Sequence, residues 1–197
     1  MNILEYWQLT PSKLSAIEEN PSLRGYIFGH VAERKLLKMW FSGPKFRHVI
    51  RYDSHDRGRK GDISFTYKST EIRVEAKSLQ TSSLKMVGDR LVGSAQVDAS
   101  DRRPVALPDG KEIQTTCLLV DQFDLLAVNI FKFEKKWQFA FALNQELPRS
   151  SYYKYPAKHR KYLLATGVKL TWPLESPFSL SPYPLLDQLV REKRKRR

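Results

Sequence analysis

The chain has a single cysteine, Cys117, so no disulfide can form within it. No apolar run approaches the roughly 18 residues that a membrane-spanning helix needs. The first five residues lack the basic start and long apolar core of a signal peptide. These absences predict a cytoplasmic protein with no membrane segment.

Two common chemical signatures are missing as well. The sequence has no Gly-x-x-x-x-Gly-Lys-Ser/Thr loop, so nucleotide hydrolysis is not indicated. The four histidines do not form a metal-ligand spacing with Cys117, which argues against a zinc site. Cys117 lies in an apolar run, where core packing is more typical than nucleophilic chemistry.

Positive charge is present in excess. The 197 residues include 34 Lys and Arg against 21 Asp and Glu, a formal net charge of +13. The basic tail, residues 191–197, holds six of the positive charges and one negative charge, so most of the excess lies in the body of the chain. A basic body favours a polyanionic partner through counterion release, and we expect nucleic acid rather than charge for solubility alone.

Hydrophobic periodicity predicts one α/β domain over residues 1–197 around a mixed sheet. The segments of regular character are one or two short helices in 1–23, a helix over 24–41, strands near 49–50, 62–67 and 70–77, a short helix over 115–123, and strands over 124–133 and 137–143. The other segments are a polar insertion at 78–112, a Pro-rich extension at 143–190 that contains a short helix near 185–190, and the tail at 191–197, which we expect to be disordered.

The most informative segment is a hairpin with acidic residues at one end. Asp62 stands thirteen residues before Glu75, and Lys77 follows two residues later. A turn centred on residues 68–69 places Asp62 opposite Glu75, and moving the turn by one residue along the chain places Asp62 opposite Lys77. Opposed residues lie within about 5.5 Å, and strand alternation puts Glu75 and Lys77 on one face. Two carboxylates beside an ammonium favour metal-assisted phosphodiester hydrolysis.

Short motifs of this kind need structural context, because four acid-x-Lys matches occur in the chain. The most serious rival joins Pro108-Asp109 to Glu134-x-Lys136, but Glu134 is expected in an exposed turn. The hairpin set has its motif at the end of an apolar-alternating strand. An exposed hairpin that carries a cross-strand salt bridge is the non-catalytic alternative.

Asp62, Glu75 and Lys77, with the order of helix, three strands, helix and strand, resemble the PD-(D/E)xK nuclease superfamily and its restriction-endonuclease-like enzymes. The resemblance covers the expected catalytic core, residues 24–142, and Gly61 replaces the motif's proline. It implies an α/β sandwich with a central mixed sheet flanked by helices. It also implies a catalytic role for Glu33, matching the family's first-helix glutamate, although a surface charge on the helix explains Glu33 equally well.

The resemblance implies a Mg²⁺-dependent endodeoxyribonuclease, with Mn²⁺ as a substitute. Asp62, Glu75 and the main-chain carbonyl of Ala76 would hold the metal. Lys77 would orient or help to deprotonate the attacking water and would stabilise the transition state. A type II-like restriction or DNA-defence role is expected, acting on double-stranded DNA as a homodimer. A junction-resolvase-like repair nuclease and a non-catalytic DNA-binding module stay open, as does RNA as the substrate.

Three basic or polar segments are candidate DNA contacts. Arg47 and Arg51 precede the first of these segments and belong to the same expected phosphate path. The second segment carries side chains that read base edges, unless it is a polar loop capped by its own aspartates. The third interleaves tyrosines with bases, and a basic surface over buried rings is the alternative. The candidates are Arg57, Arg59 and Lys60; Gln96, Asp98, Ser100, Arg102 and Arg103; and Lys154, Lys158 and Arg160.

Overall fold

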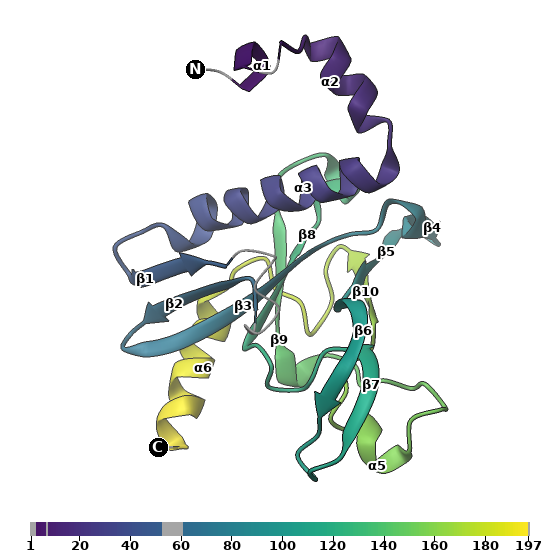
Figure 1. Ribbon diagram of the computed structural model, residues 1–197. Helices are drawn as coiled ribbons and strands as arrows, with labels where there is room; N and C mark the ends of the chain where they lie inside the picture. The colour runs from purple at the N-terminus through teal and green to yellow at the C-terminus, as the bar shows by residue number, and fades with distance from the viewer. Residues whose placement is uncertain (1–2, 7, 53–60, 197) are drawn as a thin grey trace.

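A five-stranded mixed sheet forms the centre of the molecule (Figure 1). The computed structural model describes residues 3–6, 8–52 and 61–196. The strand order is β1-β2-β3-β8-β9, in which β3 and β8 run parallel and the other neighbours run antiparallel. The bounds are β1 Phe46–Arg51, β2 Ile63–Tyr67, β3 Thr70–Ser78, β8 Leu125–Asn129 and β9 Phe139–Leu143.

Helices cover one face of this sheet. α3 (Pro21–Leu36) is capped at its N-terminus by Asn20, whose side chain accepts hydrogen bonds from the first free amides of the helix. The helix continues as the π-helical η1 (Leu37–Phe41). α6 (Tyr183–Lys195) lies on the same face. Leu36 and Leu186 are both fully buried there against the inward side of β2 and β3. The helix expected over 24–41 is therefore confirmed, with its start three residues earlier.

A small sheet covers the opposite face, where a second layer of helices was expected. Its order is β10-β5-β4, with β4 Lys85–Val87, β5 Arg90–Gln96 and β10 Gly167–Trp172. Ala95 and Val168 from this sheet pack against Leu126 and Val128 of the central one. The strands come from the insertion and the C-terminal extension, so both segments contribute to the core.

The helix expected over 115–123 is absent, and that prediction was wrong. β7 (Glu112–Cys117) pairs instead with β6 (Asp98–Ala106) in a two-stranded ribbon that projects from the body beside α5 (Ala157–Arg160) (Figure 1). The run Ile113-Gln114-Thr115-Thr116 is rich in β-branched residues, which suit a half-buried strand. Cys117 is buried with Leu107 and Leu163 at the base of the ribbon, as its apolar setting suggested.

The remaining elements are short. The chain starts with α1 (Ile3–Tyr6) and α2 (Pro11–Glu18), the two short helices expected before residue 24. The strand expected to reach residue 133 ends at Asn129, because α4 (Phe131–Glu134) follows it. Two 3₁₀ turns, η2 (Thr81–Ser83) and η3 (Asn144–Glu146), complete the set. None of the helices in the described ranges is both long and apolar enough to cross a membrane.

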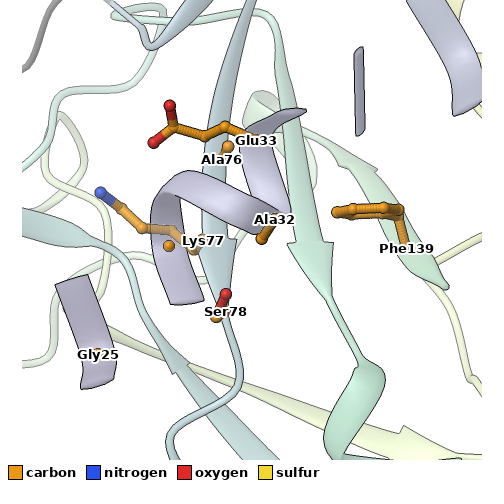
Figure 2. A pocket seen from close by; sticks show the side chains of 8 residues that line it. Gly25, Ala32, Glu33, Ala76, Lys77, Ser78 and Phe139 are labelled. Carbon is orange, nitrogen blue, oxygen red and sulfur yellow. The ribbon is translucent and has the colours of Figure 1, made fainter. Parts of the chain in front are cut away.

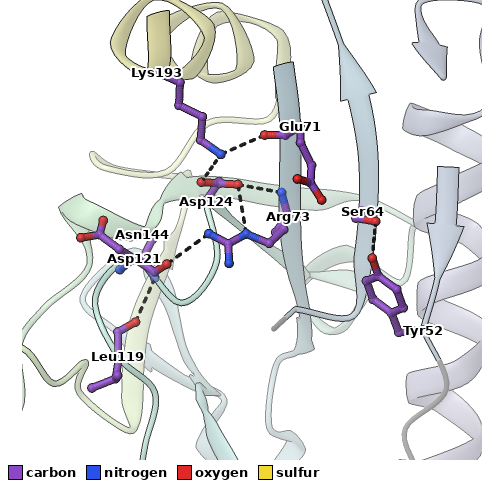
Figure 3. Close-up of polar contacts among 9 residues, drawn as sticks. All are labelled: Tyr52, Ser64, Glu71, Arg73, Leu119, Asp121, Asp124, Asn144 and Lys193. Carbon is purple, nitrogen blue, oxygen red and sulfur yellow. Dashed lines mark hydrogen bonds and ion pairs between the residues drawn. The ribbon is translucent and has the colours of Figure 1, made fainter. Parts of the chain in front are cut away.

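The basic tail was expected to be disordered, but it is helical as far as Lys195. Lys193 donates to the main-chain oxygen of Glu71 at 2.8 Å and pairs with Asp124 at 2.7 Å (Figure 3). Asp124 also accepts a hydrogen bond from the Arg73 amide at 2.8 Å. These contacts tie the end of α6 to the sheet, which a run of basic residues alone does not predict.

We expect Lys193→Ala to lower the free energy of unfolding by about 1 kcal/mol, because it removes a hydrogen-bonded partner of the mostly buried Asp124. Lys195→Ala, on the exposed side of the same turn, is the control and should change it by less than about 0.5 kcal/mol. Urea unfolding followed by circular dichroism compares the two. Equal effects would mean that the Asp124 contact does not anchor the helix.

Candidate functional site

The register of the β2–β3 hairpin decides where the acidic residues lie. Ile63 pairs with Val74 and Tyr67 with Thr70, across a two-residue turn at Lys68 and Ser69. Both turn residues have positive φ, 46° and 63°, as the favoured two-residue hairpin turn requires. Continuing this register by one residue places Asp62 opposite Glu75, the first of the two arrangements that the sequence allowed.

Asp62 lies directly before Ile63, the first residue of β2, and extends the pairing with β3 by one residue. Its amide donates to the carbonyl of Val74 at 2.9 Å, and its Oδ2 accepts from the amide of Ala76 at 2.7 Å. Because β2 begins only at Ile63, no β2 residue lies opposite Ala76, and the Asp62 carboxylate accepts the hydrogen bond of the Ala76 amide instead. The Asp62 side chain is therefore fixed against β3.

Glu75 and Lys77 share one face of β3. The Lys77 Nζ lies 2.8 Å from Oε1 of Glu75, and the Glu75 side chain is largely buried. Both residues pair in register with residues of β8 that face the small sheet, Leu126 and Val128. The three motif residues therefore meet at one end of the hairpin, as predicted.

Burial and neighbouring charge shift the ionisation of this group. Burial, followed by the charge of Glu75, raises the pKa of Asp62 from its usual 3.8 to about 7. Burial also disfavours the Lys77 ammonium, but the charges of Glu75 and Asp62 outweigh it and raise the pKa of Lys77. Among the described residues, Asp62, Glu75 and Lys77 bring two carboxylates together with one cation, an excess of negative charge that a divalent cation would offset.

Glu33 lies beside this group but has a partner of its own. Its Oε2 accepts from Arg51 Nη1 at 2.9 Å. Glu33 lines a pocket of about 190 Å³ with Ala76, Lys77 and Ser78, and Figure 2 shows its carboxylate and the Lys77 amine extending to the same side. Glu33 thus reaches the edge of the site, while its catalytic role stays a prediction.

The donors suit a hard cation that keeps much of its water. Within residues 3–6, 8–52 and 61–196, no cluster of three or more His, Cys, Asp or Glu side chains is arranged to hold a metal. Asp62 and Glu75 offer two carboxylate groups, and Mg²⁺ is commonly bound by one or two carboxylates together with waters and phosphate oxygens. The pair therefore fits Mg²⁺, and the carbonyl of Ala76 stays a predicted further ligand.

The rival acidic set is not assembled. Asp109 lies in the turn between β6 and β7, where its Oδ2 is 3.1 Å from Nε2 of the buried His159. Glu134 is exposed at the end of α4, a separate element. Asp109 thus joins the ribbon to α5 and does not form a second carboxylate pair with Glu134.

The candidate DNA contacts fall into three groups in the structure. Arg57, Arg59 and Lys60 lie outside the described residues. The second group follows the end of β5 and the start of the β6–β7 ribbon, rather than a loop: Gln96, Asp98, Ser100, Arg102 and Arg103. The third group, in and before α5, comprises Lys154, Lys158 and Arg160. Contact with DNA stays a prediction for all of them.

Two local contacts constrain the second group. Gln96 accepts a hydrogen bond from Gln80 at 2.8 Å, and Arg102 Nε donates to the carbonyl of Gln114 at 3.3 Å. Asp98 lies near enough to Lys77 to contribute to the rise in its pKa. The sequence placed Asp98 only among the DNA contacts, because its position beside the motif lysine depends on how β5 crosses the central sheet.

Sequence reasoning also overlooked Gly25 and Gly29, which line the pocket beside Glu33. Residues 25, 29 and 33 are spaced four apart, so they lie on one face of α3. That spacing was readable once the helix was recognised. A Cβ added at either glycine would meet no atom within 4 Å.

Comparison with known proteins establishes no family for this chain. No protein-family model and no curated protein matches the chain. Among solved structures, the bacterial homing endonuclease I-Ssp6803I aligns over 73% of this chain and 88% of its own, with 17% identity and a TM-score of 0.36. A likeness at this level does not establish a family.

We expect Gly25→Ala and Gly29→Ala each to raise the free energy of unfolding by up to about 1 kcal/mol, because alanine is the better helix former and the added methyl meets open space. Thermal unfolding of each variant measures this. Gly93→Ala is the contrasting control and should not be stabilised, because its Cβ would lie 3.2 Å from Leu79 and 3.5 Å from Phe133. Destabilisation by the α3 substitutions would show that this helix face is packed.

The raised pKa of Asp62 predicts a pH-dependent stability in metal-free buffer. The folded protein holds this proton more tightly than the unfolded chain, so stability present below pH 3.8 is lost as pH rises towards about 7. Asp62→Asn removes the titration and should be more stable than the parent at pH 8, by on the order of 2 kcal/mol. Urea unfolding in EDTA at pH 5.5 and pH 8 tests this, and parallel pH profiles would contradict it.

Proposed function

We propose that this protein is a Mg²⁺-dependent endonuclease that hydrolyses phosphodiester bonds in double-stranded DNA. One observation supports this most directly: the hairpin register sets Asp62 opposite Glu75, with Lys77 bonded to Glu75 on the same face. The basic body of the chain adds to it, since a net charge of +13 attracts a polyanion.

Asp62 and Glu75 would hold the metal. A bound Mg²⁺ supplies Lewis-acid chemistry, lowering the pKa of a coordinated water and offsetting charge on the phosphate. Asp62 is pre-positioned for this role by the Ala76 amide, which fixes the direction of its carboxylate. Because burial raises the pKa of Asp62 to about 7, binding of a cation near neutral pH is expected to release a proton from this carboxyl group.

Lys77 is the proposed catalytic cation. Its ammonium stays charged because Glu75 and Asp62 surround it, so it can donate hydrogen bonds to a phosphate oxygen or to the attacking water. Glu75 holds the Lys77 amine at 2.8 Å and thereby limits where it can point. A lysine charged in this way is better suited to stabilise developing negative charge than to remove a proton.

The biological setting that we propose is type II-like restriction or another defence against foreign DNA. Cutting both strands at one site requires two active sites, so we propose a homodimer. A junction-resolvase-like nuclease would share the chemistry and prefer branched DNA to linear DNA. A non-catalytic DNA-binding module would bind DNA with a steep salt dependence and show no metal-dependent turnover.

We expect Asp62→Asn, Glu75→Gln and Lys77→Ala each to reduce Mg²⁺-dependent nicking of supercoiled plasmid by at least about 100-fold, because each removes a metal ligand or the catalytic cation. Lys85→Ala, an exposed lysine of β4, is the matched control and should cut normally. Full activity of Asp62→Asn would end the proposal. Parallel assays on linear and branched DNA separate restriction from repair.

Metal binding can be followed without any cleavage. At pH 8 we expect millimolar Mg²⁺ to raise the melting temperature of the parent protein by several degrees, because a ligand that binds only the folded state stabilises it. Asp62→Asn should respond much less, while Lys85→Ala should respond like the parent. Equal shifts in all three proteins would place any bound Mg²⁺ elsewhere.

A further inference from the structure

A second cavity lies at the other end of the β2–β3 hairpin, and the proposed chemistry does not use it. Its volume is about 890 Å³. Three segments far apart in the sequence form its walls: residues 44, 45, 47 and 48 around the start of β1, residues 66–69 at the hairpin turn, and Tyr183 and Asp187 near the start of α6. The fold therefore builds this cleft from distant parts of the chain.

Two aromatic residues line the cleft, Tyr67 and Tyr183, and both rings contact the core residue Phe46. The centroid of the Phe46 ring lies 5.5 Å from that of Tyr67 and 6.4 Å from that of Tyr183, with interplanar angles of 27° and 29°. Phe46 and Tyr67 are buried in the main core, against which Tyr183 also packs. Because the core holds the two lining rings, this side of the cleft keeps its shape without a ligand, which lowers the entropy lost on binding.

The rim of the cleft is positively charged. Asp187, the one carboxylate among the described residues that line the cleft, is already bonded to Lys68 at 2.7 Å and to the Tyr67 hydroxyl at 3.0 Å. Lys45 and Arg47 line the same cleft and are exposed. Within the described part of the chain neither forms an ion pair, although the Lys45 amine lies 5.2 Å from the centroid of the Tyr183 ring. Two cations are thus left for an anion from solution.

A β-bulge in the edge strand β1 determines which of its basic residues lie at the rim of the cleft. The pairing of β1 with β2 shifts register between Arg47 and Ile50, and His48 between them has a left-handed φ of 51°. Such a conformation is unfavourable for a residue other than glycine, and bulges commonly re-aim side chains at sheet edges. β1 consequently carries Arg47 at the cleft and Arg51 at the catalytic end, where it pairs with Glu33.

We propose that this cleft binds the sugar–phosphate backbone of a nucleic acid, with Lys45 and Arg47 contacting phosphates some distance from the bond that is cut. The inference rests on the proposed function for the position of the cut. Residues 62 and 67 are five residues apart along β2, or about 17 Å in an extended strand. That length corresponds to roughly five base-pair steps of B-form DNA.

A different explanation of the same charges is protection of a sheet edge. β1 is an edge strand, and exposed lysines and arginines on such strands discourage pairing with another chain. Edge protection predicts greater self-association when the cations are removed, with DNA affinity unchanged. The two explanations therefore predict different results when the cations are removed: weaker DNA binding for the phosphate site, and self-association for edge protection.

The test compares two double variants of the full chain. Lys45→Ala with Arg47→Ala removes the cleft cations, and Lys13→Ala with Arg24→Ala removes two exposed cations from α2 and α3. Fluorescence anisotropy with a 24-base-pair duplex in EDTA, from 50 to 300 mM NaCl, gives affinity and its salt dependence. We expect the cleft variant to bind about 10-fold more weakly near 100 mM NaCl, with a salt slope smaller by roughly two, one for each lost phosphate contact.

The control variant should lose less than about twofold in affinity. Equal losses in both variants, or no loss in the cleft variant, would overturn the proposal, provided that circular dichroism shows both to be folded. Competition by a mononucleotide at 1 mM would point to a small phosphate ligand and would also count against it. Because EDTA prevents metal-dependent cleavage, this measurement stands apart from the nicking assay, and either proposal can fail while the other holds.

Discussion

The pairing register between β2 and β3 is the constraint on which the candidate site depends. A shift of one residue would turn every side chain of one strand to the opposite face of the sheet, separating Asp62 from Glu75 and exposing Phe65 and Ile63. Two features oppose that shift: the left-handed turn at residues 68–69 and the complete burial of alternate residues on the helical side. The chemistry of the site is thus held in place by the packing of the core.

The described neighbours of the charged group at the end of the hairpin do not balance its negative charge. Two carboxylates share one ammonium, and burial raises the pKa of Asp62 to about 7. An arrangement that disfavours ionisation lowers stability at neutral pH, and such arrangements are common where a cation or substrate completes the site. The contrast with Asp124 is informative, because that aspartate has Arg73 and Lys193 as partners and serves to anchor α6 (Figure 3).

The two faces of the central sheet are covered in different ways, and this shapes the surroundings of the site. α3 and α6 pack on one face, so Glu33 approaches the site from the helical side. Its partner Arg51 reaches it from the end of β1. The small sheet packs on the other face and brings Asp98, at the base of the ribbon, near Lys77. If the proposed function is right, a substrate would meet groups from both layers, together with the basic rim at the far end of the hairpin.

Much of this arrangement was readable in the amino-acid sequence. Apolar alternation and a two-residue turn predicted the hairpin, two possible registers and the meeting of Asp62, Glu75 and Lys77 at one end, because these are local properties of about sixteen residues. The sequence misassigned residues 115–123 and the basic tail, where distant partners decide the conformation: β7 pairs with β6, and Lys193 finds Asp124. Only the tertiary structure decided that Glu33 pairs with Arg51, that β10 joins β5, and that residues 44–48 meet the start of α6. Those contacts join segments tens to more than a hundred residues apart, and the free energy of packing that selects them has no counterpart in local periodicity.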